Sequence, residues 1–223
     1  MSSVLDNPVW YALSERHQQL AMRYPGVNMY PSSYCPFVGF TDLAQLPSAL
    51  DTYAEEADTF FVVGNKPIHS PRLMIQQELV CLQMVLARPM NVIPSHSISR
   101  LSPNHYPLLF SLVNLVQPGY FRPQTPEMGN YYGIFQDHEL VAVTGERMQM
   151  NDYTEVSAVV THPDYTGRGY AKQLIAHTTE HIFRQGKTPF LHVAETNIPA
   201  IRLYEKLGFQ IRRKMSFWKL IRA

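Results

Sequence analysis

Cysteine is scarce in this sequence of 223 residues, which contains only Cys35 and Cys81. Two thiols are too few for a disulfide framework, and their spacing is not that of a zinc site. We therefore expect two buried or idle thiols in a reducing compartment, and no bound metal.

Charge of one sign and long apolar runs are also missing. The 19 Lys and Arg residues balance the 18 Asp and Glu residues, so nucleic acid and anionic membrane surfaces are not expected partners. No run approaches the roughly 20 apolar residues that cross a bilayer, and the N-terminus lacks a basic segment followed by an apolar stretch. The sequence predicts a soluble cytoplasmic protein, and it is compatible with a homo-oligomer.

What is present is enough apolar sequence, 45% of all residues, to build a core. The first hundred residues suggest a helix with Asn7 as N-cap and Pro8 at its first position, then strand, helix and strand. The apolar segment 75–87 fits either a strand or a buried helix. A proline-rich connection near residues 88–100 follows, so we predict two domains, 1–95 and 96–223.

The second part has clearer periodicity. A helix within 102–117, a hairpin about the turn 136–139 and a strand that ends at Thr161 are expected first. The order then continues as helix, strand, helix and strand, with Gly208 capping the last helix. This order predicts an α/β fold with a mixed sheet and helices on both faces.

The segment "THPDYTGRGYA", residues 161–171, connects a strand to a helix. Backbone N–H groups at a helix N-terminus lack intrahelical partners and attract anions. Gly167 and Gly169 would let the backbone approach a phosphate, with Arg168 at the rim. The segment matches neither a Walker loop nor a dinucleotide fingerprint, so a ligand-free connection remains an equal alternative on these residues alone.

Two motifs in the right order resemble the GNAT superfamily, the general N-acetyltransferases that use acetyl-CoA. "TGRGYA" matches the family's pyrophosphate signature [R/Q]-x-x-G-x-[G/A], although Thr166 stands where Arg or Gln is usual. Downstream, "LHVAETNIPAIRLYEKLGF", residues 191–209, combines an Asn, a Tyr and a Gly-Phe pair at the family's distances. The resemblance extends from about residue 100 to the C-terminus.

The resemblance implies a GNAT fold in the C-terminal half, with acetyl-CoA or another acyl-CoA as co-substrate and no metal. The strand before the signature is expected to carry a bulge whose backbone pairs with the pantetheine arm, and an N–H near Val159 is expected to polarise the thioester carbonyl. The residues implied in acyl-CoA binding are Val159, Val160, Thr161, Thr166, Gly167, Arg168, Gly169, Tyr170, Ala171 and Asn197. Asn197 would fix either the pantetheine arm or the start of the last helix.

Two catalytic residues are implied as well. Tyr204 occupies the family's general-acid position, with a core tyrosine as the alternative. Glu155 occupies a position that serves as general base in some members, with a solvent-facing carboxylate as the alternative. The implied activity is an N-acyltransferase of the EC 2.3.1 type that moves an acetyl or short acyl group to a primary amine of a small molecule or amino acid. A non-catalytic CoA-binding regulatory or structural module is the second hypothesis.

The first half resembles the N-terminal part of acyltransferases similar to glycine N-acyltransferase. We therefore expect a degenerate GNAT-like half without a pyrophosphate loop, packed on the catalytic half. The acceptor amine would enter the cleft between them, with aromatic walls predicted from Tyr30, Tyr34, Tyr120 and Phe121.

Overall fold

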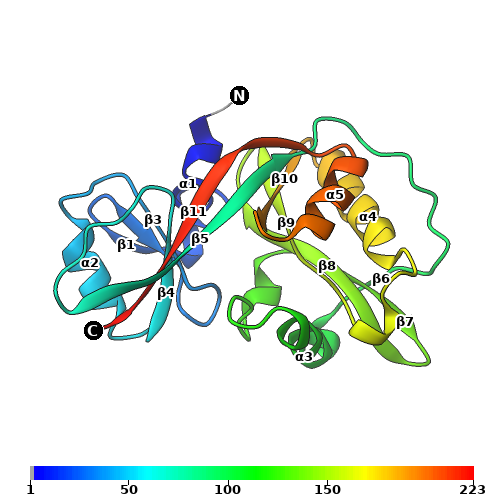
Figure 1. The fold of residues 1–223 in the computed structure, drawn as a ribbon, viewed down its shortest axis with the longest axis horizontal. Helices are drawn as coiled ribbons and strands as arrows, with labels where there is room; N and C mark the ends of the chain where they lie inside the picture. The colour runs from blue at the N-terminus through cyan, green and yellow to red at the C-terminus, as the bar shows by residue number, and fades with distance from the viewer. Residues whose placement is uncertain (1–2) are drawn as a thin grey trace.

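The computed structural model describes residues 3–223, and all of its strands belong to one sheet (Figure 1). The sheet has 11 strands in the order β1-β2-β3-β4-β11-β5-β10-β9-β8-β7-β6. The helices are α1 (Pro8–Ser14), α2 (Leu46–Tyr53), α3 (Tyr106–Val116), α4 (Tyr170–Arg184) and α5 (Ile198–Lys206). The strands are β1 (Met22–Tyr24), β2 (Val27–Met29), β3 (Phe37–Phe40), β4 (Thr59–Val63), β5 (Leu73–Val85), β6 (Ser99–Arg100), β7 (Tyr131–Gln136), β8 (Glu139–Gln149), β9 (Tyr153–Thr161), β10 (Thr188–Ala194) and β11 (Gln210–Arg222).

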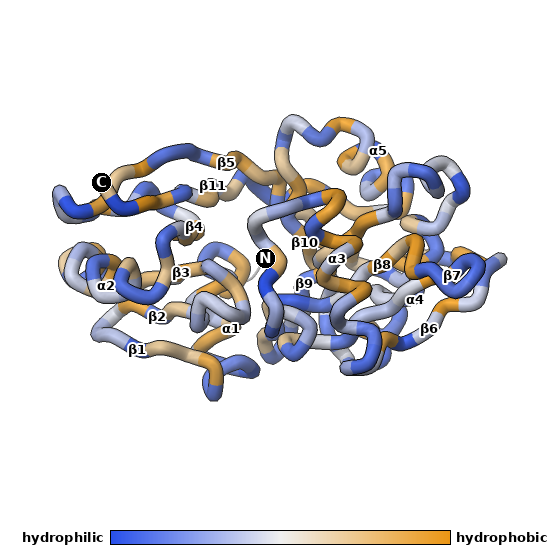
Figure 2. The backbone as a smooth tube through the Cα atoms, turned by 90° about the horizontal axis from the view of Figure 1, so that it is seen from below, coloured by the Kyte–Doolittle hydropathy of each residue, from blue (hydrophilic) through white to orange (hydrophobic). Residues whose placement is uncertain are grey.

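Helices α3 and α4 cover opposite faces of the C-terminal half of the sheet. Successive strand residues point to opposite faces, and neighbouring residues of β7 accordingly meet different helices. Tyr131 packs in the cluster that contains Leu112 of α3, whereas Tyr132 packs with Leu174 of α4. The strands between these layers are strongly hydrophobic along β8 and β10 (Figure 2). The predicted α/β fold, a mixed sheet with helices on both faces, is confirmed.

The N-terminal half repeats this layering with α1 and α2. Phe37 of β3 packs in a cluster with Val9 of α1, and its neighbour Val38 packs with Leu50 of α2. Helix α1 begins at Pro8, as expected, but ends at Ser14. Helix α2, the second helix expected in this half, begins at Leu46, and Pro47 suits its first turn.

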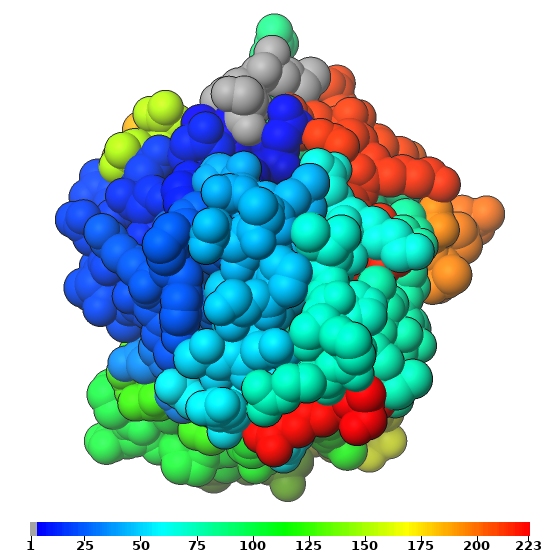
Figure 3. Space-filling view, turned by 90° about the vertical axis from the view of Figure 1, so that its left-hand side faces the viewer, coloured from blue at the N-terminus to red at the C-terminus, as the bar shows by residue number. Residues whose placement is uncertain are grey.

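Two long strands join the halves. Strand β5, from the first half, pairs with β10, and β11, from the second half, pairs with β4; β5 and β11 also pair with each other. They run diagonally between the halves in Figure 1, and Figure 3 shows the red C-terminal residues beside the first residues of β5. The segment 75–87, for which the sequence allowed a strand or a buried helix, therefore lies largely in a strand.

The predicted domain boundary falls in the extended connection between β5 and β6, which passes around α4 and α5 in Figure 1. The side chain of Gln173 in α4 holds this connection, because its Oε1 accepts hydrogen bonds from the backbone N–H groups of Ser95 and His96, at 2.7 and 3.1 Å. Within residues 3–223, no helix is long and apolar enough to cross a membrane.

The hairpins show which local signals were informative. The turn predicted at 136–139 connects β7 and β8, and Asp137 and His138 both have positive φ, as the tight turn requires. The β1–β2 hairpin was not predicted. Its turn depends on Gly26 at φ +67°, a single glycine inside a segment rich in tyrosine and proline.

Candidate active site

The candidate site begins where β9 and β10 separate. These parallel strands pair only from Tyr153 to Glu155 on β9, opposite Thr188 to Phe190 on β10. Beyond this point β10 pairs with β5 on its other side, while the β8–β9 register shifts between the pairs Val143–Val160 and Gly145–Ser157. Ala158, inside the shift, has φ +51°. The expected bulge is therefore present, and the facing edges of β9 and β10 leave backbone groups available to a ligand.

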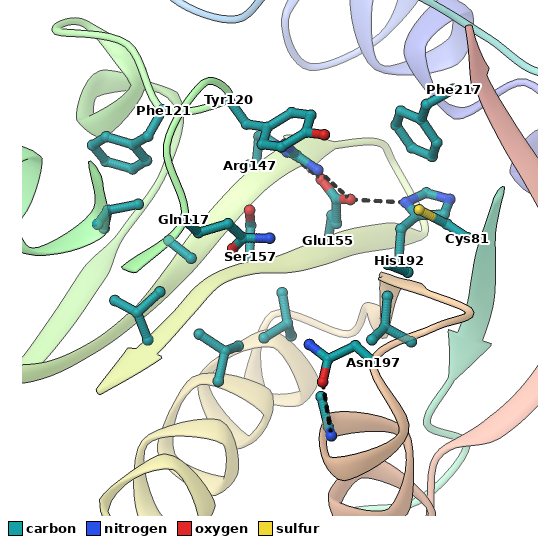
Figure 4. A pocket seen from close by; sticks show the side chains of 18 of the residues that line it. Cys81, Gln117, Tyr120, Phe121, Arg147, Glu155, Ser157, His192, Asn197 and Phe217 are labelled. Atoms are coloured by element: carbon teal, nitrogen blue, oxygen red, sulfur yellow. Dashed lines mark hydrogen bonds and ion pairs between the residues drawn. The ribbon is translucent and has the colours of Figure 1, made fainter. Parts of the chain in front are cut away.

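A cavity of about 340 Å³ fills this wedge. Its lining brings together Glu155, Val159, Val160, Asn197 and Tyr204, which the sequence had placed in one site. Figure 4 shows Glu155 on the β9 side and Asn197 at the start of a helix below it. Thr161 and residues 166–171 are not part of this lining; they continue from β9 toward α4.

The loop before α4 has two glycines in the left-handed region and no side-chain cap at the helix start. Gly167 and Gly169 have φ +77° and +75°, and an added Cβ would meet no atom within 4 Å at Gly167 and only the Gln173 amide at 4.0 Å at Gly169. Gly169 is the N-cap of α4 and offers no side-chain cap, so the first N–H groups of the helix face outward. These groups and the positive end of the helix dipole would favour a pyrophosphate.

The other residues of this loop have secondary roles. Thr166 donates to the Pro163 carbonyl at 3.1 Å, and Arg168 lies over the Tyr165 ring at 4.7 Å, on the exposed rim. The side chain of Tyr170 is buried against His96, with ring centroids 4.8 Å apart. Tyr170 can therefore offer a ligand only its backbone.

Helix α5 positions the two residues of the second motif. Asn197 is its N-cap, where Oδ1 accepts from the Ala200 N–H at 3.3 Å, and its amide nitrogen remains on the cavity side (Figure 4). Tyr204 lies two turns further on, packed edge-to-face on Phe209. Its hydroxyl has no hydrogen-bond partner among the residues described, and burial raises the pKa of Tyr204 above the usual phenol value. The phenol therefore stays protonated at neutral pH.

Glu155 is the centre of a buried charged cluster. Its carboxylate accepts bonds from Arg147 Nε at 2.7 Å, Arg147 Nη2 at 2.8 Å and His192 Nδ1 at 2.8 Å. Burial alone would raise the pKa of the Glu155 carboxyl, but Arg147 and His192 bring it down to about 2. The alternative of a solvent-facing carboxylate is wrong, since Glu155 is only 1% exposed.

Gln83 of β5 fixes the other side of His192. Its amide nitrogen donates to the Leu5 carbonyl at 2.8 Å, and its oxygen accepts from Arg212 at 2.8 Å. The amide nitrogen, 3.1 Å from His192 Nε2, is thus the donor to that atom. This pattern assigns the ring proton to Nδ1, which donates to Glu155.

Several lining residues were missed from the sequence, because they come from distant segments. Arg147, His192, Phe37, Cys81 and Phe217 all line the cavity. No spacing rule connects positions on β3, β5, β8, β10 and β11. Burial raises the pKa of the Cys81 thiol to about 12, so it remains a neutral thiol rather than a nucleophilic thiolate.

The predicted aromatic walls are half right. Tyr120 and Phe121 line the cavity. Tyr30 does not, because it is fully buried in the core beneath α1, and Tyr34 instead donates to Glu127 at 2.9 Å. Among residues 3–223 no group of three or more His, Cys, Asp or Glu side chains could hold a metal ion.

A bulged strand that separates from its parallel neighbour, followed by a glycine-rich turn into a helix, is the arrangement that the resemblance to the GNAT superfamily predicts. Comparison with known proteins agrees. The FR47-like protein family matches residues 131–218. A GNAT-family protein from Novosphingobium aromaticivorans DSM 12444 is 30% identical over 98% of both chains, with a TM-score of 0.90. The chain therefore belongs to the GNAT family and has the fold of its acetyltransferases.

More distant structures share the fold. A GCN5-related N-acetyltransferase from Kribbella flavida is 17% identical, covers 96% of this chain and 95% of its own, and has a TM-score of 0.61. A tandem GNAT protein from the clavulanic acid biosynthesis pathway is 14% identical over 86% of this chain and 77% of its own, with a TM-score of 0.58. No curated protein matches the sequence.

Proposed function

We propose that the protein transfers an acetyl or other short acyl group from acyl-CoA to a primary amine of a small molecule or amino acid, by direct attack. The observation that carries this proposal is one cavity that joins the open edge of β9 to Tyr204 and Glu155. A one-step transfer is favoured over an acyl-enzyme because the Cys81 thiol is kept protonated.

On the acyl-CoA side, the backbone of Val159, Val160 and Thr161 would pair with the pantetheine arm along the free edge of β9. The N–H groups from Gly167 to Ala171 would hold the pyrophosphate, and the free amide nitrogen of Asn197 would bond the arm at the cavity. Support comes from the bulge, the two glycines at positive φ and the uncapped helix N-terminus.

In the reaction, the neutral amine attacks the thioester carbonyl carbon while the N–H near Val159 stabilises the charge on its oxygen. The C–S bond breaks, Tyr204 protonates the departing thiolate, and the proton that the amine nitrogen loses passes through solvent to the Tyr204 phenolate and restores the phenol. Burial favours the neutral form of the Tyr204 phenol, so the proton is in place when the thiolate departs. Glu155 takes a hydrogen bond from the amine. Its low pKa makes it a weak base, and the pH–rate profile of Glu155→Gln tests whether it also accepts the proton.

The test is thiol release from acetyl-CoA over a panel of amines, with CoA binding measured separately. Tyr204→Phe should lower kcat by about 10² to 10⁴ and leave CoA binding unchanged. Tyr131→Phe is the matched control, since it also removes a tyrosine hydroxyl without a hydrogen-bond partner, but a buried one outside the cavity. CoA binding without release on any amine, together with no effect of Tyr204→Phe, would instead identify a non-catalytic CoA-binding module.

The N-terminal half is, in this proposal, a degenerate GNAT-like half of the kind seen in proteins similar to glycine N-acyltransferase. The order α1, three antiparallel strands, α2 and the parallel strand β4 matches α3, β7–β9, α4 and β10. Strand β11 of the C-terminal half lies antiparallel beside β4, and strand β5 of the N-terminal half lies antiparallel beside β10. Residues 41–45, which enter α2, read "TDLAQ" and contain no glycine, so this half lacks a pyrophosphate turn.

A further inference from the structure

One wall of the active-site cavity is built from aromatic rings of both halves of the chain. Phe37 and Phe217 meet edge-to-face, with centroids 5.4 Å apart, and Phe217 meets His192 in the same way at 5.2 Å. Tyr120 extends the wall through Phe61, which lies behind it at 5.1 Å. In Figure 4, Tyr120 and Phe217 stand on either side of the Glu155 cluster. A further aromatic ring could pack against this wall, edge-to-face or tilted as these rings do.

The charges in the cavity cancel. Within the described chain, Arg147 and Glu155 are the two lining residues with permanent charge, and they form a bidentate pair. An acceptor with several ammonium groups, or with a free carboxylate, would meet no unmatched charge there. Moving such a group out of water without a partner is costly. The cavity therefore favours an acceptor whose body is uncharged.

The charged cluster around Glu155 can nevertheless accept one hydrogen bond from an amino group. Glu155 Oε1 accepts two hydrogen bonds, from Arg147 Nη2 and His192 Nδ1, whereas Oε2 accepts one, from Arg147 Nε. Oε2 can thus accept one more bond, from an amine N–H. The guanidinium nearby and the apolar wall both disfavour an ammonium relative to the neutral amine, which is the form that attacks.

The volume limits the acceptor further. Ligand cavities in proteins typically span about 300 to 1,000 Å³. This cavity of about 340 Å³ is at the small end of that range and must also admit the thioester. It leaves room for a single ring and not for a multi-ring or polymeric acceptor.

We infer that the acceptor is a small primary amine attached through a short linker to one aromatic ring, which lies against Phe37, Tyr120 and Phe217 while the amino group bonds Glu155. The inference rests on the proposed acyl transfer.

The test compares four amines with acetyl-CoA in the thiol-release assay: 2-phenylethylamine, hexylamine, phenylalanine and spermidine. We expect kcat/KM for 2-phenylethylamine to exceed the value for each of the others by at least about ten-fold, because the others lack the ring or carry an unmatched charge. Equal or better turnover of spermidine, phenylalanine or hexylamine would overturn the inference and leave the acyltransferase proposal intact.

Variants of Tyr120 test whether the aromatic ring of the acceptor binds against this side chain. Tyr120→Ala should raise KM for 2-phenylethylamine about ten-fold, and Tyr120→Phe should restore it. Tyr34→Ala, which removes a partly exposed tyrosine outside the cavity, should change KM less than two-fold. An unchanged KM in Tyr120→Ala would contradict the inference.

Calorimetric titration of 2-phenylethylamine into the CoA-bound protein measures amine binding independently of turnover. It therefore distinguishes a failure of the acyltransferase proposal from a failure of the inference about the acceptor. If no amine is acylated, the acyltransferase proposal fails, and binding that Tyr120→Ala weakens still supports the aromatic site. Absence of binding at millimolar concentration overturns the inference.

Discussion

The buried pair between Arg147 and Glu155 leads to the most quantitative prediction. The pKa of the Glu155 carboxyl falls from 4.5 to about 2 in the folded protein. At about 1.4 kcal/mol per pKa unit, this shift corresponds to about 3 kcal/mol of folding free energy. Removing one partner of a buried ion pair typically lowers the free energy of unfolding by about 3 to 5 kcal/mol. This range agrees with the value obtained from the pKa shift. Glu155→Gln should therefore lower the free energy of unfolding at pH 7 by about 3 kcal/mol.

The pH dependence has a definite sign. Because the folded-state pKa is lowered, the ionised carboxylate stabilises the protein above pH 4.5, and this contribution is lost as the pH falls toward 2. The difference between wild type and Glu155→Gln should shrink over that range. Urea unfolding at pH 7, 5, 4 and 3 measures it, and at neutral pH the Tm should fall by about 6 to 12 °C.

Glu180→Gln is the control, because Glu180 forms an exposed helical pair with Arg184 and should contribute less than about 0.5 kcal/mol. Adding Arg147→Met to Glu155→Gln should recover part of the loss, since the uncompensated guanidinium is then gone. A Glu155→Gln protein as stable as wild type at pH 7, or a deficit that does not change between pH 7 and 3, would refute the reasoning.

Two further predictions concern the loop and the network. Gly169→Val and Gly186→Val each place a side chain at φ near +75°, in open space, so each should cost about 1 to 2 kcal/mol of stability. Only Gly169→Val should weaken CoA binding, by ten-fold or more, and equal CoA affinities measured by calorimetry would argue against the anion site. Gln83→Leu removes the hydrogen-bond donor to His192. Chemical denaturation should show a free energy of unfolding lower by about 1 to 3 kcal/mol, and kcat should also fall. The exposed Gln77→Leu on the same strand should stay within about 0.5 kcal/mol, and a similarly mild Gln83→Leu would count against the network.

The sequence was most informative where the signal is local. The hairpin at 136–139, the turn "TGRG" and the helix that begins after Asn197 each depend on residues a few positions apart, and the structure has all three. The charged cluster was out of reach. Glu155 was predicted to be a site residue, but Arg147 and His192 lie on β8 and β10 and meet it only once the sheet is paired. Without them, its burial and its low pKa could not be inferred.

The exchanged strands explain why the aromatic wall of the cavity, the proposed acceptor side, was the hardest part to predict. Strand β5 reaches the C-terminal half beside β10 and brings Cys81 and Gln83 to the site, while Phe217 arrives on β11, which pairs with β4. Phe37, from the opposite end of the chain, completes the wall. The proposed acyl-CoA side is thus encoded in one contiguous motif region, whereas the proposed acceptor wall exists only after the two halves have exchanged strands. Changes in the N-terminal half should therefore alter acceptor preference without touching the glycine-rich turn.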